Sequence, residues 1–160
     1  MVAGSFSDEV TVAMPADKLW KIAFTEFNPL LLPKACAGFI ESVEVEGDGG
    51  PGTVTTMKFT AAVEDAKVFK TRVVATDHAA RVVRSEVLEG GKVSSQLSSE
   101  TTEMKVEPAG EAACVVKITV QYERDGGELP PEDQAKLAQG YLSLIKKVEE
   151  YLVAHPEELA

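Results

Sequence analysis

The chain has 160 residues, of which 44% are hydrophobic and 26% are charged, and its formal net charge at pH 7 is -10. This length and composition are typical of one globular domain, residues 1–160, that is large enough to enclose a pocket, and they exclude a disordered or membrane-spanning chain. The negative charge disfavours nucleic acid and anionic membranes as partners.

The N-terminal residues lack the basic and apolar regions of a secretory signal, so we expect a cytosolic protein. Cys36 and Cys114 are far apart in the sequence, and His78 and His155 are equally isolated. Metal sites normally use closely spaced ligands, and cytosolic thiols are kept reduced. We therefore predict two free thiols, no metal site and no cofactor.

Residues 5–13 alternate between apolar and polar side chains, which predicts an opening strand. An amphipathic helix follows, because apolar residues recur at three- and four-residue spacing before Asn28-Pro29 interrupts the pattern. Its apolar residues are Leu19, Trp20, Ala23, Phe24 and Phe27. Residues 30–37 contain Pro33, so a second helix here is expected to be brief or kinked.

From Gly38 to Tyr122 the hydrophobic period changes to two, with turn signals about every ten residues. This pattern predicts six strands joined by short turns. Together with the opening strand they form an antiparallel sheet of about seven members.

A glycine-rich loop stands between two of these strands and consists of Gly47, Asp48, Gly49, Gly50, Pro51 and Gly52. Such a loop is either a crowded hairpin turn or a small anion-binding nest. A nucleotide-binding loop needs Lys-Ser/Thr and a helix directly after its last glycine. Here a strand follows at residues 53–59, which favours the turn.

The last segment predicts a helix of about 24 residues, which begins at Pro130-Pro131 and ends at His155-Pro156. Its apolar stripe contains Leu137, Tyr141, Leu144, Ile145, Val148 and Leu152. Gly140 is unusual inside a helix and suggests a close approach by another group. A twisted seven-stranded sheet around one long helix leaves space for a ligand cavity.

Several segments resemble the plant pathogenesis-related class 10 family, named for the major birch pollen allergen. They include Leu32-Pro33-Lys34, the glycine-rich loop, Glu89-Gly90-Gly91, Cys114-Val115-Val116-Lys117-Ile118 and residues 148–156. The sequence around Cys36 is most similar to that of monocot members of the family. The resemblance implies an α+β helix-grip fold in which a curved seven-stranded antiparallel sheet grips the long C-terminal helix, supported by two short helices.

The resemblance also implies a defence or stress protein whose cavity binds small hydrophobic or amphiphilic molecules, such as cytokinins, flavonoids and other metabolites. Strand alternation and the helix stripe, and for Lys117 the resemblance alone, then suggest which side chains line the cavity. The expected lining is Phe24, Ile40, Thr55, Met57, Phe59, Phe69, Thr71, Val73, Val83, Ser85, Val87, Thr102, Met104, Lys117, Tyr141 and Ile145. Plain core packing is the alternative for each of them.

Three residues are candidates for catalysis. Lys117 corresponds to a lysine that sits in the cavity of the related norcoclaurine synthases, although alternation along its own strand points it to solvent. Glu149 and Tyr151 match part of a ribonuclease site proposed for the family, but Thr55 and Ser98 replace its lysine and a glutamate. The resemblance therefore leaves a condensing enzyme and a weak ribonuclease as alternatives to a binding protein without chemistry.

A third alternative is a structural stress protein whose cavity is incidental. Abscisic acid receptors share the fold and carry a gate proline that phosphatases bind. Residues 87–91 have no proline at this place, so we expect no phosphatase partner. We expect a monomer or a weak dimer.

Overall fold

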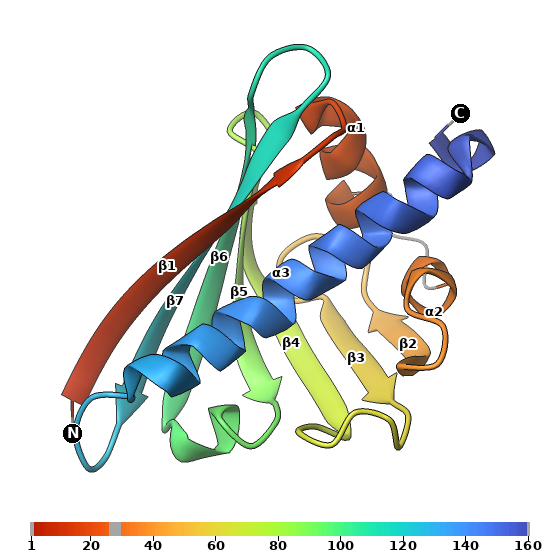
Figure 1. The fold of residues 1–160 in the computed structure, drawn as a ribbon. Helices are drawn as coiled ribbons and strands as arrows, with labels where there is room; N and C mark the ends of the chain where they lie inside the picture. The colour runs from red at the N-terminus through yellow and green to blue at the C-terminus, as the bar shows by residue number, and fades with distance from the viewer. Residues whose placement is uncertain (1, 26–29, 160) are drawn as a thin grey trace.

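A seven-stranded antiparallel sheet curves around one long helix (Figure 1). The computed structural model describes residues 2–25 and 30–159. The strands are β1 (Val2–Val12), β2 (Ile40–Glu46), β3 (Val54–Phe59), β4 (Val68–Asp77), β5 (Val82–Glu89), β6 (Ser99–Pro108) and β7 (Cys114–Arg124). Their order in the sheet is β1-β7-β6-β5-β4-β3-β2, so the chain's first two strands form the two edges.

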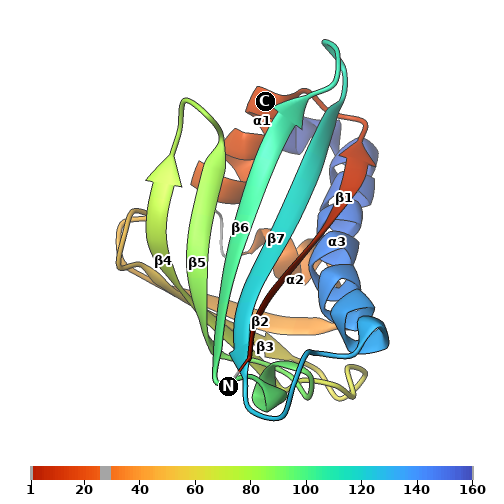
Figure 2. The same cartoon turned by 90° about the vertical axis from the view of Figure 1, so that its left-hand side faces the viewer.

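Strand β7 shows why the sheet has one buried face. Cys114, Val116, Ile118, Val120 and Tyr122 are all buried, whereas the residues between them are half-buried or exposed. Successive side chains of a strand point to opposite faces, so this alternation places the core on the concave side. β1 pairs with β7 in continuous register along its length, and Figure 2 shows β1 lying beside the long helix at this edge.

The long helix α3 (Pro131–Ala154) has 24 residues, which agrees with the predicted length and ends. It crosses the concave face diagonally (Figure 1) and buries Tyr141, Ile145, Val148 and Leu152 of the predicted stripe. Leu137 and Leu144 are only half-buried. This difference arises because both side chains line a cavity beneath the helix.

Two short helical segments support the middle and the C-terminal end of α3. Helix α1 (Ala16–Trp20) continues as a π-helical turn, η1 (Lys21–Thr25), instead of the regular helix that the spacing predicted. The predicted positions Phe27, Asn28 and Pro29 lie outside the described residues. In helix α2 (Leu31–Ala35), Pro33 occupies the first turn, where a backbone N–H has no partner within the helix.

The glycine-rich loop is a tight hairpin between β2 and β3. Gly49 N donates to Thr53 Oγ1 at 2.9 Å, Gly50 N donates to Asp48 Oδ1 at 2.9 Å and Gly52 N donates to Val73 O at 2.8 Å. An anion nest needs free N–H groups that converge on one point. These three amides already have acceptors within the protein, which favours the hairpin turn over an anion nest.

Two 3-10 turns complete the described chain: η2 (Ser94–Gln96), in the connection between β5 and β6, and η3 (Pro156–Leu159), after α3. Among the described residues, no helix is both long and apolar enough to cross a membrane. Cys36 and Cys114 are buried free thiols, as predicted from their spacing.

Candidate functional site

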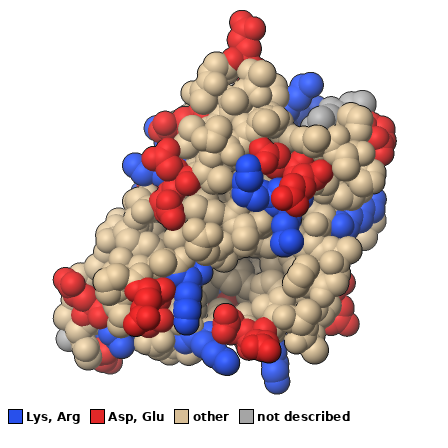
Figure 3. All heavy atoms as spheres, in the orientation of Figure 1, with Lys and Arg blue, Asp and Glu red and all other residues tan. Residues whose placement is uncertain are grey.

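A cavity of about 420 Å³ lies between residues 133–147 of α3 and the ends of strands β2, β3 and β4. Met57, Phe59, Phe69 and Leu137 form much of its apolar wall. The connections between β3 and β4 and between β5 and β6 close one end. Figure 3 shows a hollow on this face of the molecule, and side chains of both charges lie at its rim. The volume is within the range of about 300–1,000 Å³ that is typical of small-molecule sites.

Charged side chains gather around this cavity: Asp65, Lys92, Asp133, Lys136 and Lys147. The Lys147 ammonium lies 4.9 Å from the centroid of the Phe39 ring, which is itself exposed. An apolar interior with a charged rim suits an amphiphilic molecule. Its apolar part loses contact with water, and its polar part stays near the rim.

A second, smaller cavity of about 130 Å³ lies between α3, α2 and η1. Phe24, Met104 and Ile145 contribute to its lining. Tyr141 and Leu144 line both cavities, so their side chains form a partition between them. The Tyr141 ring is held edge-on against Phe69, with 5.6 Å between the ring centroids.

Tyr141 also forms a buried polar pair with Glu100 of β6. The Tyr141 hydroxyl donates to Glu100 Oε2 at 2.9 Å. Burial raises the pKa of Glu100 above its ordinary value of 4.5, and the Ser94 and Tyr141 hydroxyls only partly offset this effect. Burial, together with the neighbouring Glu100, also raises the pKa of Tyr141 well above 10.0, so the phenol stays neutral and remains a donor.

The predicted lining residues fall into two groups. Eight of them line one or both cavities: Phe24, Ile40, Met57, Phe59, Phe69, Met104, Tyr141 and Ile145. The strand register places seven others on the same concave face, but they line neither cavity: Thr55, Thr71, Val73, Val83, Ser85, Val87 and Thr102. They lie farther along the strands from the connections that close the larger cavity.

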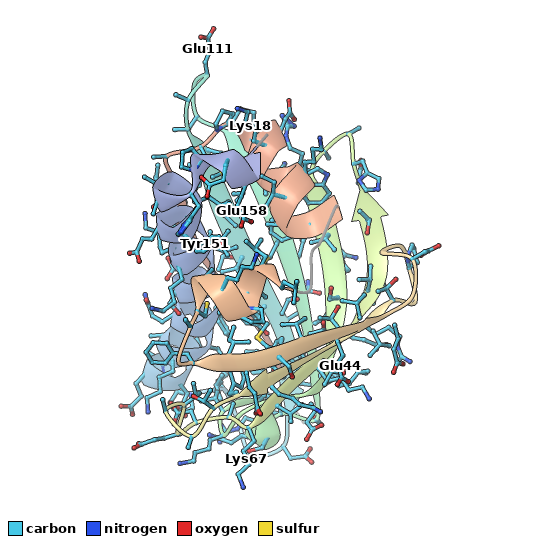
Figure 4. The ribbon with its side chains drawn as sticks, turned by 90° about the vertical axis from the view of Figure 1, so that its right-hand side faces the viewer. Lys18, Glu44, Lys67, Glu111, Tyr151 and Glu158 are labelled. Atoms are coloured by element: carbon cyan, nitrogen blue, oxygen red, sulfur yellow. The ribbon has the colours of Figure 1, made fainter. Side chains whose placement is uncertain are left out.

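The three catalytic candidates do not meet at the cavity. Lys117 is exposed, because alternation along β7 turns it to the convex face, and its expected place in the lining is corrected. Glu149 accepts hydrogen bonds from Ala13 N at 2.5 Å and from Lys146 Nζ at 2.6 Å. Figure 4 shows Tyr151 near the C-terminal end of α3, where its hydroxyl donates to Glu158 at 2.9 Å.

Sequence reasoning missed the cavity residues that come from connections, since these segments have no hydrophobic period. A useful signal was Glu89-Gly90-Gly91. A Cβ atom on Gly91 would lie 2.6 Å from Asp65 O, and the next amide, Lys92 N, donates to the same oxygen at 2.9 Å. Gly91 therefore allows the two connections to meet and close the cavity.

Gly140 lines the larger cavity, and a Cβ atom built on it would have no neighbour within 4 Å. The close approach expected from the sequence is therefore absent. We expect Gly140→Ala to raise the free energy of unfolding by about 1 kcal/mol, because alanine loses less backbone entropy in a helix. Urea unfolding would measure this change in the free energy of unfolding. Gln139→Ala is the control and is expected to have only a small effect. A loss of stability would show that the glycine is required by packing.

No group of three or more His, Cys, Asp or Glu side chains that could hold a metal occurs within residues 2–25 and 30–159.

Known proteins share both the sequence pattern and the fold. The profile of the pathogenesis-related protein Bet v 1 family matches residues 1–155. Pathogenesis-related protein 1 from Asparagus officinalis is 31% identical over 159 residues, covering 98% of each chain. Norbelladine synthase from Narcissus pseudonarcissus is 35% identical over 123 residues, covering 76% of each chain. Among solved structures, Ara h 8.0201 superposes with a TM-score of 0.77 and 26% identity, covering 96% of this chain and 99% of the other.

Proposed function

The chain belongs to the pathogenesis-related protein Bet v 1 family, and we propose that it binds a small hydrophobic or amphiphilic molecule in the cavity under α3. The observation that carries this proposal is the cavity of about 420 Å³ with an apolar wall and a charged rim. Cytokinins, flavonoids and other plant metabolites are the ligand classes to test. The defence or stress role and the cytosolic location implied by the resemblance are part of the same proposal.

The composition of the cavity wall favours a ligand-binding pocket over a region of plain core packing. Met57 and Phe69 offer large, adaptable surfaces, while Ser94, Gln96 and Tyr141 supply a few polar groups at fixed places. A pocket of this kind gains affinity mainly from apolar burial and orients its ligand with few hydrogen bonds.

The catalytic alternatives receive no support from the positions of their residues. The similarity to norbelladine synthase does not carry a condensing activity to this chain, because Lys117 faces solvent. Glu149 and Tyr151 line neither cavity, and both make hydrogen bonds within the fold. We therefore propose a carrier or buffer without chemistry of its own.

We expect anilinonaphthalene sulfonate to bind saturably with a rise in fluorescence, and a cytokinin or a flavonoid to displace it. Gly140→Phe should weaken binding of the dye at least about tenfold, because the added ring fills the cavity at a wall position with free space. Gln139→Phe, on the neighbouring exposed position, is the matched control and should bind like the wild type. Equal affinities for both variants, or no displacement by any metabolite, would refute the proposal.

A further inference from the structure

Strand β1 forms one edge of the sheet, and part of this edge has no partner. A residue in an antiparallel strand directs its N–H and its C=O to the same side. Glu123, opposite Ala3 in β7, accepts from Ser98 N on its β6 side at 2.8 Å, so Ala3 and every second residue after it direct these groups away from β7. Ala3, Ser5 and Ser7 thus present an N–H and a C=O each, six groups in all, and no described residue outside the sheet bonds to them.

The rest of the edge is closed by polar side chains. Glu9 N donates to Asp8 Oδ1 at 2.8 Å. Thr11 O accepts from Lys146 Nζ of the long helix at 3.3 Å. Both Glu9 and Thr11 belong to the same alternate set of outward-directed residues, so the open edge consists of residues 3–7.

The opposite edge of the sheet, strand β2, carries the features that hinder pairing with another strand. It has three glutamates among its seven residues, Glu41, Glu44 and Glu46, and its register with β3 is shifted near its start. Charged side chains and an irregular register are common protections of edge strands. Residues 2–7 of β1 carry no charge, so the open edge does not have this protection.

We propose that the open edge pairs with the open edge of a second copy of this chain and forms a weak two-fold dimer. The two β1 strands run antiparallel, with Ser5 opposite Ser5 of the second copy and Ala3 opposite Ser7 of the second copy. This register forms six hydrogen bonds from the six free groups of each copy, and it joins the two seven-stranded sheets. The pairing is independent of ligand binding in the cavity.

Side chains on the concave face favour this register. Phe6 is only half-buried, and it falls opposite Gly4 of the second copy. Gly4 is required because the Tyr122 ring of β7 lies across it, where a Cβ atom would collide with the ring. Phe6 of the second copy therefore packs beside Tyr122 and loses more of its contact with water, which favours association.

The charges near the open edge are compatible with a second copy. Asp8 of the second copy falls opposite Val2, in the row that continues to Arg124 of β7, so opposite charges lie two strands apart on the same face. Within residues 2–8, no acidic side chain of one copy falls opposite an acidic side chain of the other. Both copies carry a net charge of -10, so their long-range repulsion weakens the dimer and salt reduces this effect.

The geometry predicts a dimer that is weak and closed. A strand pair of five residues buries much less than the roughly 1,200 Å² of a stable interface. Pairing of two identical edges is complete after two copies, whereas pairing of β1 with β2 would continue into a filament. An extended segment of another protein is the competing occupant of the open edge, and it would leave this chain monomeric when pure.

Sedimentation equilibrium in about 0.15 M salt, from about 10 µM to about 1 mM protein, tests the pairing. We expect a reversible monomer–dimer equilibrium. Ser5→Pro removes two hydrogen bonds, one in each copy, and should raise the dissociation constant at least about tenfold. Proline is tolerated on an edge strand where the lost N–H faces solvent. Ser5→Ala, which keeps the N–H, is the matched control and should dimerise like the wild type.

Crosslinking tests the register without the proline variant. Two residues of a hydrogen-bonded pair have Cα atoms about 5.5 Å apart, which a disulfide can span. A mixture of Ala3→Cys and Ser7→Cys should therefore form covalent heterodimers on oxidation, faster than either variant forms homodimers alone. The native thiols Cys36 and Cys114 are buried.

A chain that stays monomeric at the highest concentration, or a dimer that Ser5→Pro does not weaken, would overturn the proposal. Crosslinking of either cysteine variant with itself as fast as in the mixture would contradict the assigned register. The dye titration measures ligand binding separately, so failure of the dimer and failure of the proposed function are distinguishable.

Discussion

Tyr141→Ala is expected to join the two cavities into one and to lower the free energy of unfolding by about 3 kcal/mol. The Tyr141 side chain is buried, packs against Phe69 and forms the partition together with Leu144. Truncation of a large buried side chain removes its apolar contacts and leaves a void that the surroundings fill only in part. Urea unfolding would give the stability change, and a set of apolar ligands of increasing length would report the longer cavity through a shift of preference to larger members.

The variant Tyr141→Phe distinguishes the contribution of the ring from that of the hydroxyl. Phenylalanine keeps the partition, so ligand size preference should stay as in the wild type. The lost hydrogen bond leaves Glu100 Oε2 without its donor, which is expected to cost about 1–3 kcal/mol. If Tyr141→Phe also shifted the preference to larger ligands, the hydroxyl bond, and not the ring alone, would hold the partition in place. If Tyr141→Ala left size preference unchanged, the two cavities would be independent.

The sequence predicted those parts of the fold that have a regular hydrophobic period. Alternation identified the strands, and prolines and acidic residues marked the start of α3. The cavity residues that were correctly anticipated, such as Met57, Phe69 and Tyr141, belong to these periodic elements. Burial imposes the period, so a regular element shows its inner face without reference to the rest of the chain.

The rest of the site depends on contacts between distant segments. Asp65 and Gly91 close the cavity because two connections meet, and no local pattern shows that they do. Glu100 is different, because the alternation along β6 already shows which face of the sheet it lies on. It has the same parity in β6 as Thr102 and Met104, which were both expected inside, and a charged residue at an inward position is itself a signal.

Glu100→Gln is expected to stabilise the protein at neutral pH in the absence of ligand. The pKa of Glu100 is raised in the folded state, so the folded protein holds this proton more tightly than the unfolded chain. The contribution of this group to the free energy of unfolding is therefore fully present below the ordinary pKa of 4.5. It is lost as pH rises through the folded pKa. Each pH unit between the two values changes the free energy of unfolding by about 1.4 kcal/mol. Glutamine stays neutral and should abolish this loss.

Glu149 provides the opposite dependence in the same molecule. Burial alone would raise its pKa, but the hydrogen bonds from Lys146 and from Ala13 N outweigh burial and lower it. A lowered pKa stabilises the fold above 4.5, and this contribution is lost as pH falls through the folded pKa. Glu149→Gln should therefore be less stable than the wild type at neutral pH, and the difference should shrink in acid.

The two variants affect different parts of the pH dependence of stability. The contribution of Glu100 to stability changes above pH 4.5, and that of Glu149 changes below pH 4.5. Urea unfolding of the wild type and both variants, at several pH values on each side of 4.5, would measure the two branches. The expected result is a profile for Glu100→Gln that no longer falls toward neutral pH but keeps its acid limb. An unchanged fall toward neutral pH would mean that Glu100 is ionised without cost, and hence that the hydrogen bonds to its carboxyl fully compensate for burial.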